Sequence, residues 1–593
     1  MNAVHQLLTD QIDIWTAAEA EKKSGRGRSS SNGASVYGIK KLRELILELA
    51  VRGKLVPQDA NDEPASELLK RIQVERAKLV AEGKIKKGKP LLPITEEEEP
   101  FDLPDNWEWV RFGEVCSYIQ RGKGPAYVDN SDFLVISQKC VRWAGLDLSQ
   151  ARYIDPESLI KYEEIRKLCE GDILWNSTGT GTIGRACFVP PLDVNKILLA
   201  DSHVTVVRPV AILSIFLWRW IQSPSVQSNI EGAASGTTNQ IELNTSTVIS
   251  HSLPLPSLAE QHRIVAKVDE LMALCDQLET QHINATEAHE KLVNHLLATL
   301  TQAQSADDFS ANWQRIAAHF DTLFITESSI DVLKQALLQL AVMGKLVPQD
   351  AKDEPASELL KRIQAEKAKL IAEGKIKKGK PLLPITEDEK PFELPEGWQL
   401  IRLNELLNKI GAGSTPLGGK QVYVNEGIPF LRSQNVWNEA LKLDDVAFIT
   451  QETHHKMSGT HVCAGDLLFN ITGASIGRCA IVPDSFKTGN VSQHVTIVRP
   501  ISIDILLYLH LVLISRHVQK TVMDVQVGVS REGLSIGKLG QFIIPIPPLL
   551  EQDRIVTKVD ELMALCDQLK TRITEANQLQ QKLADGVVEQ AVA

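Results

Sequence analysis

Cysteine is scarce in this sequence, and no run of apolar residues is long. The eight cysteines among 593 residues never occur with the Cys-x-x-Cys spacing found in many zinc and redox sites. Because Cys275 and Cys566 occupy equivalent positions in apolar helical patterns, we expect buried free thiols and neither zinc nor disulfides. No stretch approaches the roughly 18 apolar residues that span a bilayer, and the N-terminal residues lack a signal peptide's apolar core. These absences favour a cytoplasmic protein without a metal site.

The sequence also lacks the excess of basic residues that many nucleic-acid-binding proteins carry. Its formal net charge is −11, from 64 Lys and Arg against 75 Asp and Glu. This value argues only weakly against nucleic acid, because affinity for phosphate follows a local basic face and not the total charge. A hydrophobic content of 43% argues against overall disorder. The length predicts roughly three to five domains.

The chain contains an internal repeat with an offset of 291 residues. Residues 53–101 return as 344–392 with six differences among 49 positions, and 263–278 return as 554–569 with one difference. The segments between these blocks have diverged until only scattered phrases still align. One unit is therefore written twice. A nearly constant frame around two unlike inserts predicts that the frame meets the same partner twice, while the inserts meet different ligands.

Helical periodicity predicts the structure of the frame. Ile39, Leu42, Ile46 and Leu49 share one face of a helix that should end at Gly53. A second helix is expected over about 62–83, and both helices recur in the second copy. Residues 1–21 predict a further amphipathic helix, followed by a flexible linker over 22–33. That helix is either a hook for a partner or an idle tail.

Heptad spacing predicts a long helix after each insert. Apolar residues recur at alternating steps of four and three, which is typical of a coiled coil. Two such stripes in one chain most simply pack against each other. The helix-pairing residues are Ile264, Val268, Leu271, Cys275 and Leu278 in the first copy and Ile555, Val559, Leu562, Cys566 and Leu569 in the second.

The inserts have a different pattern, with short β-rich runs between Gly and Asn turns. The runs are 133–137, 171–177, 186–190 and 203–209 in the first insert and 429–433, 465–472, 480–483 and 494–500 in the second. We therefore predict an α/β (α+β) fold class, with two globular domains joined by two long helices packed as an antiparallel coiled coil. The two halves should be related by an internal pseudo-two-fold repeat.

Two motifs resemble nucleotide-binding sites. Gly179, Gly181 and Gly184 form a Gly-x-Gly-x-x-Gly pattern after a predicted strand, but the second copy lacks the middle glycine, so a tight turn between strands is the favoured interpretation. Residues 83–89 and 374–380 nearly form a phosphate-binding loop. Each follows a helix, and Pro90 and Pro381 stand where a Ser or Thr hydroxyl is needed. A solvated basic linker is favoured there, with contact to DNA phosphate as the alternative.

From about residue 36 to its end, the chain resembles the specificity subunits of type I restriction-modification enzymes, most closely their B family. The matching phrases are GIKKLRELILELAVRGKLVPQD, Trp107 and Trp398 at the start of each insert, GSTP at 413–416, GDILWNSTGTGTIGR, GDLLFNITGASIGR, SGTTNQIELN, LPLPSLAEQHRIV and IPIPPLLEQDRIV. One departure is RGKGPAY at 121–127 where the second insert has GAGSTP. It makes the first of these two loops the weaker candidate for contact with DNA.

The resemblance implies a non-catalytic subunit that binds double-stranded DNA. Each insert would be a target recognition domain that reads one half of a bipartite asymmetric site. Two methyltransferase (modification) subunits would carry adenine-N6 methylation, and restriction/translocase subunits would carry cleavage. This chain would bind no cofactor itself; S-adenosylmethionine, ATP and magnesium would be used by partner subunits. If both domains enter the major groove from one face, the half-sites should lie roughly 34 Å apart.

Base reading needs side chains on loops that donate or accept two hydrogen bonds, such as Arg or Lys for guanine and Asn or Gln for adenine. We expect about one in three of the candidates to contact a base edge, because half or more of such bonds go to phosphate and sugar. The DNA-binding candidates are Arg121, Lys123, Gln138, Lys139, Arg142, Thr178, Thr180, His203, Asn239 and Gln240 in the first insert and Lys409, Ser414, Thr415, Gln434, Asn435, Thr472, Ser475, Gln493, His494, Ser530 and Arg531 in the second.

Two rival functions remain at this point. One is a self-contained DNA methyltransferase or nuclease with duplicated DNA-binding domains, although no motif for either chemistry is found. The other is a helical scaffold that binds only proteins. The predicted segments are an N-terminal helix and linker (1–38), a helical frame (39–104), recognition domain 1 (105–256), a coiled-coil helix (257–300), a connector (301–330), the second frame (331–395), recognition domain 2 (396–547) and the second coiled-coil helix (548–593).

Overall fold

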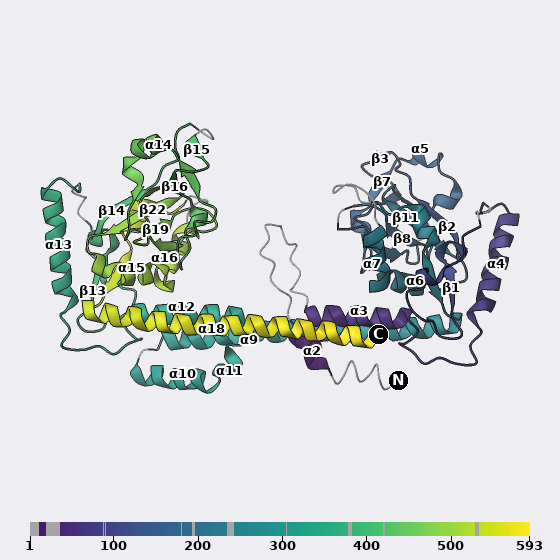
Figure 1. Cartoon of the computed structure of the whole chain (residues 1–593), viewed down its shortest axis with the longest axis horizontal. Helices are drawn as coiled ribbons and strands as arrows, with labels where there is room; N and C mark the ends of the chain where they lie inside the picture. Colours follow the sequence, from purple (N-terminus) through teal and green to yellow (C-terminus); the bar gives the residue numbers. More distant parts are fainter. Residues whose placement is uncertain are drawn as a thin grey trace. The chain divides into compact units, whose positions relative to one another are not determined.

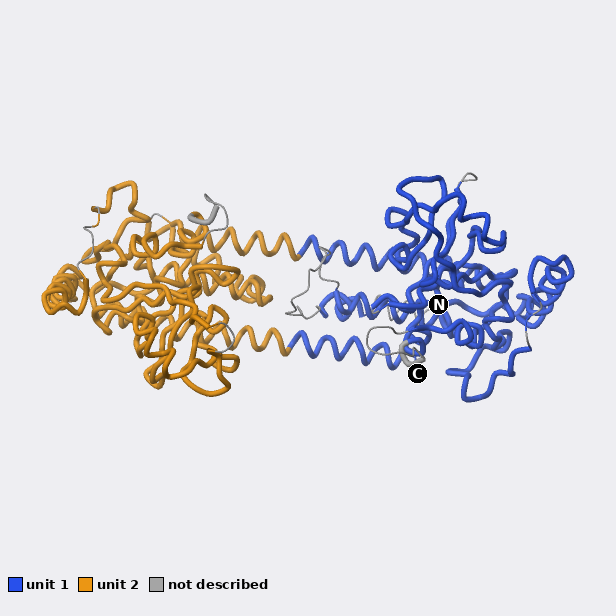
Figure 2. The backbone as a smooth tube through the Cα atoms, turned by 90° about the horizontal axis from the view of Figure 1, so that it is seen from above, with its two compact units in different colours: residues 1–285, 576–593 blue, residues 286–575 orange. Residues whose placement is uncertain are grey.

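A computed structural model describes residues 11–18, 36–86, 88, 90–179, 181–192, 196–233, 242–303, 305–377, 382, 384–418, 422–527 and 533–592. The chain forms two compact units, coloured separately in Figure 2. Unit 1 holds residues 1–285 and 576–593, and unit 2 holds residues 286–575. Each unit therefore contains one insert, one frame and a part of both long helices.

The frame helices form where the periodicity predicts them. In unit 1 they are α3 (Tyr37–Val51) and α4 (Ala65–Ala81), and in unit 2 they are α12 (Glu327–Val342) and α13 (Ala356–Ala372). The N-terminal pattern yields the short helix α2 (Ile12–Ala17), which packs on α3. Its Trp15 is fully buried, so the described part of this segment is docked on the frame.

Glycine is required where α3 ends. Gly53 has a φ of +66°, a conformation that few other residues adopt without strain. A Cβ atom there would lie 2.5 Å from Cγ of Pro104, so the missing side chain also lets the chain pack closely. Gly344 has the same conformation, with a φ of +68°, against Pro395. The turn after the frame helix is thus identical in the two copies.

The long helices are α9 (Leu258–Thr301) and α18 (Leu549–Val592). In unit 1 the buried stripe of α9, which includes Cys275, lies in one apolar cluster with α3 and with Ala584 near the end of α18. In unit 2 Cys566 of α18 lies in a cluster with α12 and with Val293 near the end of α9. The beginning of each long helix therefore packs beside the end of the other, which confirms the antiparallel arrangement.

The clusters also show which residues bury each stripe. Each apolar stripe, residues 264–278 of α9 or 555–569 of α18, packs within its own unit. It lies against the frame helix and the C-terminal part of the other long helix. Contact between the two stripes is not needed to bury either one, and their direct pairing stays a prediction. Burial of each Leu, Ile or Val side chain contributes about 1.5–3 kcal/mol before ordering costs. Cys275 and Cys566 are buried free thiols, as predicted.

Each insert begins and ends at the same place. Strand β1 (Glu108–Arg111) pairs antiparallel with β12 (Ser252–Leu255), with Glu108 opposite Leu255. In unit 2, β13 (Gln399–Arg402) pairs with β23 (Ile543–Ile546) in the same way. In each two-stranded sheet the first strand of the recognition domain pairs with its last strand. The domain is therefore a modular insertion into the frame.

Recognition domain 1 contains two four-stranded sheets with the strand orders β10-β4-β7-β3 and β2-β11-β8-β9, and a small hairpin β5-β6. Strands β4 and β10 are parallel, and the other described pairs are antiparallel. The strands are β2 (Cys116–Arg121), β3 (Tyr127–Val128), β4 (Phe133–Ile136), β5 (Val141–Arg142), β6 (Gly145–Leu146), β7 (Arg152–Ile154), β8 (Ile173–Asn176), β9 (Ala186–Phe188), β10 (Ile197–Ala200) and β11 (Val204–Pro209).

Recognition domain 2 repeats this plan. Its sheets have the orders β14-β22-β19-β20 and β15-β17-β16-β21-β18. The strands are β14 (Leu407–Ala412), β15 (Tyr423–Val424), β16 (Ile428–Leu431), β17 (Ala447–Ile449), β18 (His461–Val462), β19 (Leu467–Asn470), β20 (Cys479–Ile481), β21 (Gly489–Val491) and β22 (Val495–Pro500). All eight predicted β-rich runs form strands.

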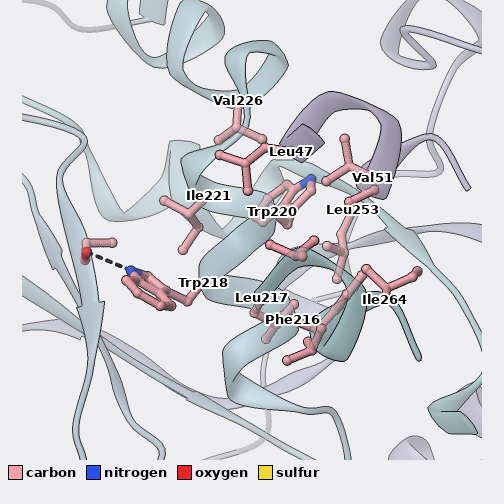
Figure 3. Packing of buried hydrophobic residues seen from close by; sticks show 14 of the residues in the cluster. Leu47, Val51, Phe216, Leu217, Trp218, Trp220, Ile221, Val226, Leu253 and Ile264 are labelled. Atoms are coloured by element: carbon pink, nitrogen blue, oxygen red, sulfur yellow. Dashed lines mark hydrogen bonds between the residues drawn. The ribbon is translucent and has the colours of Figure 1, made fainter. Parts of the chain in front are cut away.

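Helices connect each domain to its frame. Helix α6 lies between the sheet and α3 in unit 1, and α15 has the same place in unit 2 (Figure 1). Figure 3 shows Phe216, Leu217 and Trp220 of α6 among Leu47 of α3 and Ile264 of α9. The other helices are α5 (Pro156–Leu159), α6 (Ser214–Gln222), α7 (Pro224–Ala233) and α8 (Thr245–Ser250) in unit 1 and α10 (Ala306–Ala318), α11 (Phe320–Leu323), α14 (Gln451–Lys456), α15 (Leu506–Ile514), α16 (Arg516–Val527) and α17 (Ile536–Gly540) in unit 2.

An ion pair inside each domain shows that the diverged inserts share a skeleton. Arg208 binds the buried carboxylate of Asp172 through Nε and Nη2, both at 2.7 Å. Arg499 binds Asp466 in the same way, at 2.6 and 2.9 Å. Both carboxylates are completely buried, so loss of either arginine would leave an uncompensated buried charge.

Candidate nucleic-acid interface

Four loops meet at one end of recognition domain 1. They follow β2, β4, β8 and β10, and hydrogen bonds hold them together. The amide of Lys123 donates to the carbonyl of Ala200 at 3.0 Å, and the side chain of Asn176 donates to the carbonyl of Gln138 at 3.1 Å. The amide of Ser177 donates to the carbonyl of His203 at 2.9 Å. We call the residues of these four loops the first loop cluster.

Recognition domain 2 has a second loop cluster with the same connections. The amide of Ser414 donates to the carbonyl of Val491 at 3.2 Å, and the amide of Ile471 donates to that of His494 at 3.0 Å. The side chain of Asn470 donates to the carbonyl of Ser433 at 2.9 Å. Both Asn176 and Asn470 are fully buried, so each fixes two loops without taking part in the surface.

A threonine and a histidine pair at the surface of each cluster. Thr178 Oγ1 lies 2.7 Å from Nδ1 of His203, and Thr472 Oγ1 lies 2.6 Å from Nδ1 of His494. Both histidines are exposed. This contact uses Nδ1 and fixes the orientation of each imidazole ring, and it leaves Nε2 available to other groups. The two domains therefore share the same Thr–His pair, although the surrounding loop sequences differ.

The RGKGPAY and GAGSTP loops are more alike in structure than in sequence. Gly122 and Gly413 occupy the same place after β2 and β14. A Cβ atom at Gly122 would lie 2.1 Å from the carbonyl oxygen of Ala200, and one at Gly413 would lie 2.0 Å from that of Val491. Glycine is therefore required at both positions, and both loops belong to their clusters.

The Gly-x-Gly-x-x-Gly motif forms a turn between paired strands. Strands β8 and β9 are antiparallel neighbours, and Gly179, Gly181 and Gly184 all have positive φ values, of 104°, 76° and 82°. A dinucleotide site would need the motif to open a helix. The prediction of a tight turn is confirmed. Gly83 and Gly374 follow helices α4 and α13. A phosphate-binding loop would instead follow a strand.

The structure places most of the sequence-predicted candidates within the two clusters and their flanking loops, at different depths. Those outside the described residues are Thr180, Asn239, Gln240, Ser530 and Arg531. The exposed ones are Lys123, Lys139, Arg142, His203, Ser414, Thr415, Gln434, Gln493 and His494. The half-buried ones are Arg121, Gln138, Thr178, Lys409, Thr472 and Ser475, and Asn435 is buried.

Two candidates hold the loops in place, and a third, Lys409, lies within strand β14. Arg121 Nη2 donates to the carbonyls of Ser177 and Leu243 at 3.3 and 3.4 Å. Asn435 has 2% of its surface exposed and is hydrogen-bonded within its own loop, so its amide offers no edge to a base. Lys409 points to the carbonyl of His461 at 3.5 Å, and burial lowers its pKa. The sequence could not show this, because turn geometry decides which way each side chain points.

Three candidates in domain 2 make further polar contacts at the surface. Thr415 Oγ1 donates to Oε1 of Gln493 at 3.1 Å. Gln434 Nε2 donates to Oδ2 of Asp445 at 2.6 Å. Each exposed amide therefore keeps free donor or acceptor positions while its orientation is fixed. Fixed amides on a loop are suited to reading base edges.

Sequence reasoning missed three residues beside the second cluster, which are Trp437, Lys442 and Arg478. The indole ring of Trp437 contacts both cations, with Lys442 Nζ at 3.9 Å and Arg478 Cζ at 3.8 Å from the ring centroid. The available signal was a basic residue directly after each glycine turn, at Arg185 and Arg478.

In the described parts of the chain, no group of three or more His, Cys, Asp or Glu side chains is placed to hold a metal ion. A cavity of about 330 Å³ lies beside Arg111 and Trp220. No helix among the described residues has both the length and the apolar character needed to cross a bilayer.

Comparison with known proteins agrees with this arrangement. The family model of the type I restriction modification DNA specificity domain matches twice, over residues 104–288 and 395–580. The chain belongs to the type I restriction-modification specificity family. As a member of it, the chain is a non-catalytic specificity subunit. The two matches coincide with the two inserts and the first part of each long helix.

Two curated relatives match over the full length of both chains. The EcoEI specificity subunit of Escherichia coli is 38% identical over 618 residues, and the EcoAI specificity subunit of the same species is 38% identical over 602. Among solved structures, the HsdS subunit of Thermoanaerobacter tengcongensis matches with a TM-score of 0.36 and 19% identity, covering 84% of this chain and 98% of that one. Both curated relatives are therefore matched from end to end by this chain.

Proposed function

We propose that this specificity subunit binds double-stranded DNA through its two loop clusters and that each cluster reads one half of a bipartite, asymmetric site. The observation that carries the proposal is the duplicated skeleton with unlike exposed side chains. Thr178 and His203 repeat as Thr472 and His494, whereas Lys139 and Arg142 have no basic counterpart at Gln434 and Trp437. A constant frame with variable donors is what two different half-sites require.

The chain directs chemistry that its partners perform. Two methyltransferase subunits bind the two frames and methylate adenine at N6, and restriction/translocase subunits complete the complex. S-adenosylmethionine, ATP and magnesium are bound by those partners in the cytoplasm. The near-identity of the two frames supports this proposal, and the GKLVPQD phrase favours the B family.

Exposed leucines at repeat-related positions support the pair of partner sites. Leu274 and Leu583 are exposed in unit 1, and Leu565 and Leu292 are exposed in unit 2, with 42 to 49% of each side chain accessible. Residues 274 and 565, and likewise 292 and 583, are separated by the repeat offset of 291. Each unit therefore presents the same apolar positions on its helical frame, and a partner helix could cover them.

A gel shift with randomised duplexes tests the proposal. The purified chain and its complex with the methyltransferase subunit are each incubated with the duplex pool, and bound sequences are read out. Selection of a bipartite asymmetric sequence by the complex supports the proposal. Binding of S-adenosylmethionine by the isolated chain would favour the self-contained enzyme, and binding of partner protein but of no DNA would favour the scaffold.

A further inference from the structure

Trp437 and Lys442 lie on the loop that follows β16, and Arg478 lies directly before β20. The amide of Trp437 donates to the carbonyl of Ala440 at 3.2 Å, which closes a hairpin with Val436 opposite Leu441. Lys442 is exposed, whereas Trp437 and Arg478 are half-buried. Cation–π contacts at these distances orient the two charges.

Within the described part of the chain, neither Lys442 nor Arg478 has a carboxylate within 4.0 Å. The nearby Asp445 accepts a hydrogen bond from Gln434 at 2.6 Å and lies 3.9 Å from Arg432. Two positive groups on one ring repel each other, and an anion held between or beside them would remove that repulsion.

The group belongs to the second loop cluster. Trp437 Nε1 donates to the carbonyl of Gln434 at 2.9 Å, and the amide of Cys479 donates to Oδ1 of Asn438 at 3.1 Å. The hairpin is therefore tied both to the base-reading candidate Gln434 and to the glycine turn that carries Thr472. Because the indole N–H is already used, the ring offers no donor to a base.

Domain 1 has different chemistry in the equivalent positions. Backbone hydrogen bonds from Asp147 to Cys140 and from Lys442 to Asn435 align the two hairpins, so that Arg142 corresponds to Trp437. Arg142 there faces the carboxylate of Asp147 at 4.0 Å, where domain 2 has the ammonium group of Lys442. Only domain 2 thus combines an aromatic platform with two cations that lack an acidic partner among the described residues.

We propose that Trp437, Lys442 and Arg478 form a clamp for a backbone phosphate of the DNA next to the second half-site. The proposal rests on the proposed function. The indole fixes the two cations, Lys442 supplies a point charge and Arg478 a planar donor, and together they set the position of Gln434 on the duplex. A phosphate contact of this kind positions the protein and carries no base preference.

The salt dependence of DNA binding tests the clamp. Complexes of the methyltransferase subunit with the parent chain, Lys442→Gln, Arg478→Gln and Lys487→Gln are titrated with the selected duplex between about 50 and 200 mM salt. Each phosphate contact changes the slope of log K against log salt by about 0.9. We expect each clamp variant to reduce the magnitude of the slope by up to about 0.9, because the two cations share one phosphate. We also expect Trp437→Leu, which keeps both charges, to weaken binding about two- to five-fold.

Lys487 serves as the matched control, because it is exposed and lies between β20 and β21, at the edge of the sheets opposite the loop cluster. Its variant should keep the parent slope. The clamp variants should lose affinity equally for all base changes in the second half-site. A parent slope in both clamp variants, or a loss confined to one base pair, would overturn the clamp, whereas failure of the parent complex to select any sequence would overturn the proposed function instead.

Discussion

The indole N–H of Trp107 donates a hydrogen bond of 2.9 Å to the buried carboxylate of Glu260. Trp398 and Glu551 form the same bond at 3.0 Å, with the same separation of 153 residues. In each unit this bond connects the first residue of the insert to the first turn of the long helix. The recognition domain is thereby fixed to its frame by a polar contact that is shielded from water.

Removing the donor should destabilise the unit that contains it. Trp107→Phe keeps the aromatic ring but leaves a buried carboxylate oxygen without its partner, which costs about 1–3 kcal/mol. Denaturant unfolding of the parent and variant chains measures the loss. Trp398→Phe should lower the stability of unit 2 by a similar amount, and Trp143→Phe, an exposed residue, should change little. An unchanged midpoint for both buried variants would contradict this role.

The same carboxylates should make stability depend on pH. Burial raises the pKa of Glu260 and of Glu551 above the ordinary 4.5 in spite of their hydrogen bonds. A raised pKa in the folded state means that the protonated carboxyl contributes to stability. This contribution is present below pH 4.5 and is lost as the pH rises through the folded-state pKa. Unfolding measured from pH 4 to 7 should show Glu260→Gln gaining on the parent chain with rising pH.

Glu98 should act in the opposite direction. Its hydrogen bonds with Arg111 lower the pKa of this carboxyl to about 2. The stabilisation that it gives is therefore present above the ordinary pKa of 4.5 and is lost as the pH falls toward 2. Glu98→Gln should flatten the acid limb of the stability profile, and a profile equal to that of the parent chain would show that the ion pair is unimportant.

Each surface histidine should serve one half-site. His494→Ala removes the ring that Thr472 orients and should reduce selection of bases in the second half-site about tenfold, while the first half-site is selected as before. His203→Ala should do the reverse. Methylation of a randomised duplex library by the complex measures both. Loss of selection at both half-sites in either variant would contradict separate reading.

Replacing one insert should change one half of the target. Because β1 and β12 close domain 1 at its root, residues 107–253 can be exchanged for the equivalent insert of a relative without new ends in the frame. The first half of the methylated sequence should change, and the second half and the spacer should stay. Methylation mapping checks the result, and a simultaneous change of both halves would show that the domains do not act separately.

A half-chain ending near Leu300 should form a symmetric dimer. The Cys275 cluster of unit 1 loses Ala584 and its neighbours from α18, but the repeat-related Val293 of a second copy can replace Ala584. The dimer should methylate an inverted repeat of the first half-site. Ultracentrifugation measures assembly. Cys275→Asp should leave the half-chain monomeric, and a monomeric parent half-chain would refute the interpretation.

Two methyltransferase subunits should bind one chain. Native mass measurement of the saturated complex should show two copies. Leu274→Asp with Leu583→Asp, which alters unit 1, should remove one copy, and Leu565→Asp with Leu292→Asp should remove the other. Leu443→Asp, an exposed leucine in a recognition domain, is the control. One copy in the saturated parent complex would contradict the proposed stoichiometry.

Sequence alone predicts the repeat, the frame helices, the antiparallel long helices and the eight strand runs. These features depend on local periodicity and on identity between distant blocks, and both are visible in the letters. The blocks that keep the offset of 291 residues also place Trp107 and Trp398 in equivalent bonds.

Which loop residues face outward depends on the folded chain and cannot be read from the letters. The phrases SQK and SQN align by their letters, but Asn176 binds the carbonyl of Gln138 and Asn470 binds that of Ser433, so the loops correspond with a shift of one residue. The shift buries Asn435 and places Trp437 between two cations. Side-chain direction in a loop is set by hydrogen bonds to segments far away in the chain, and no local pattern contains that information.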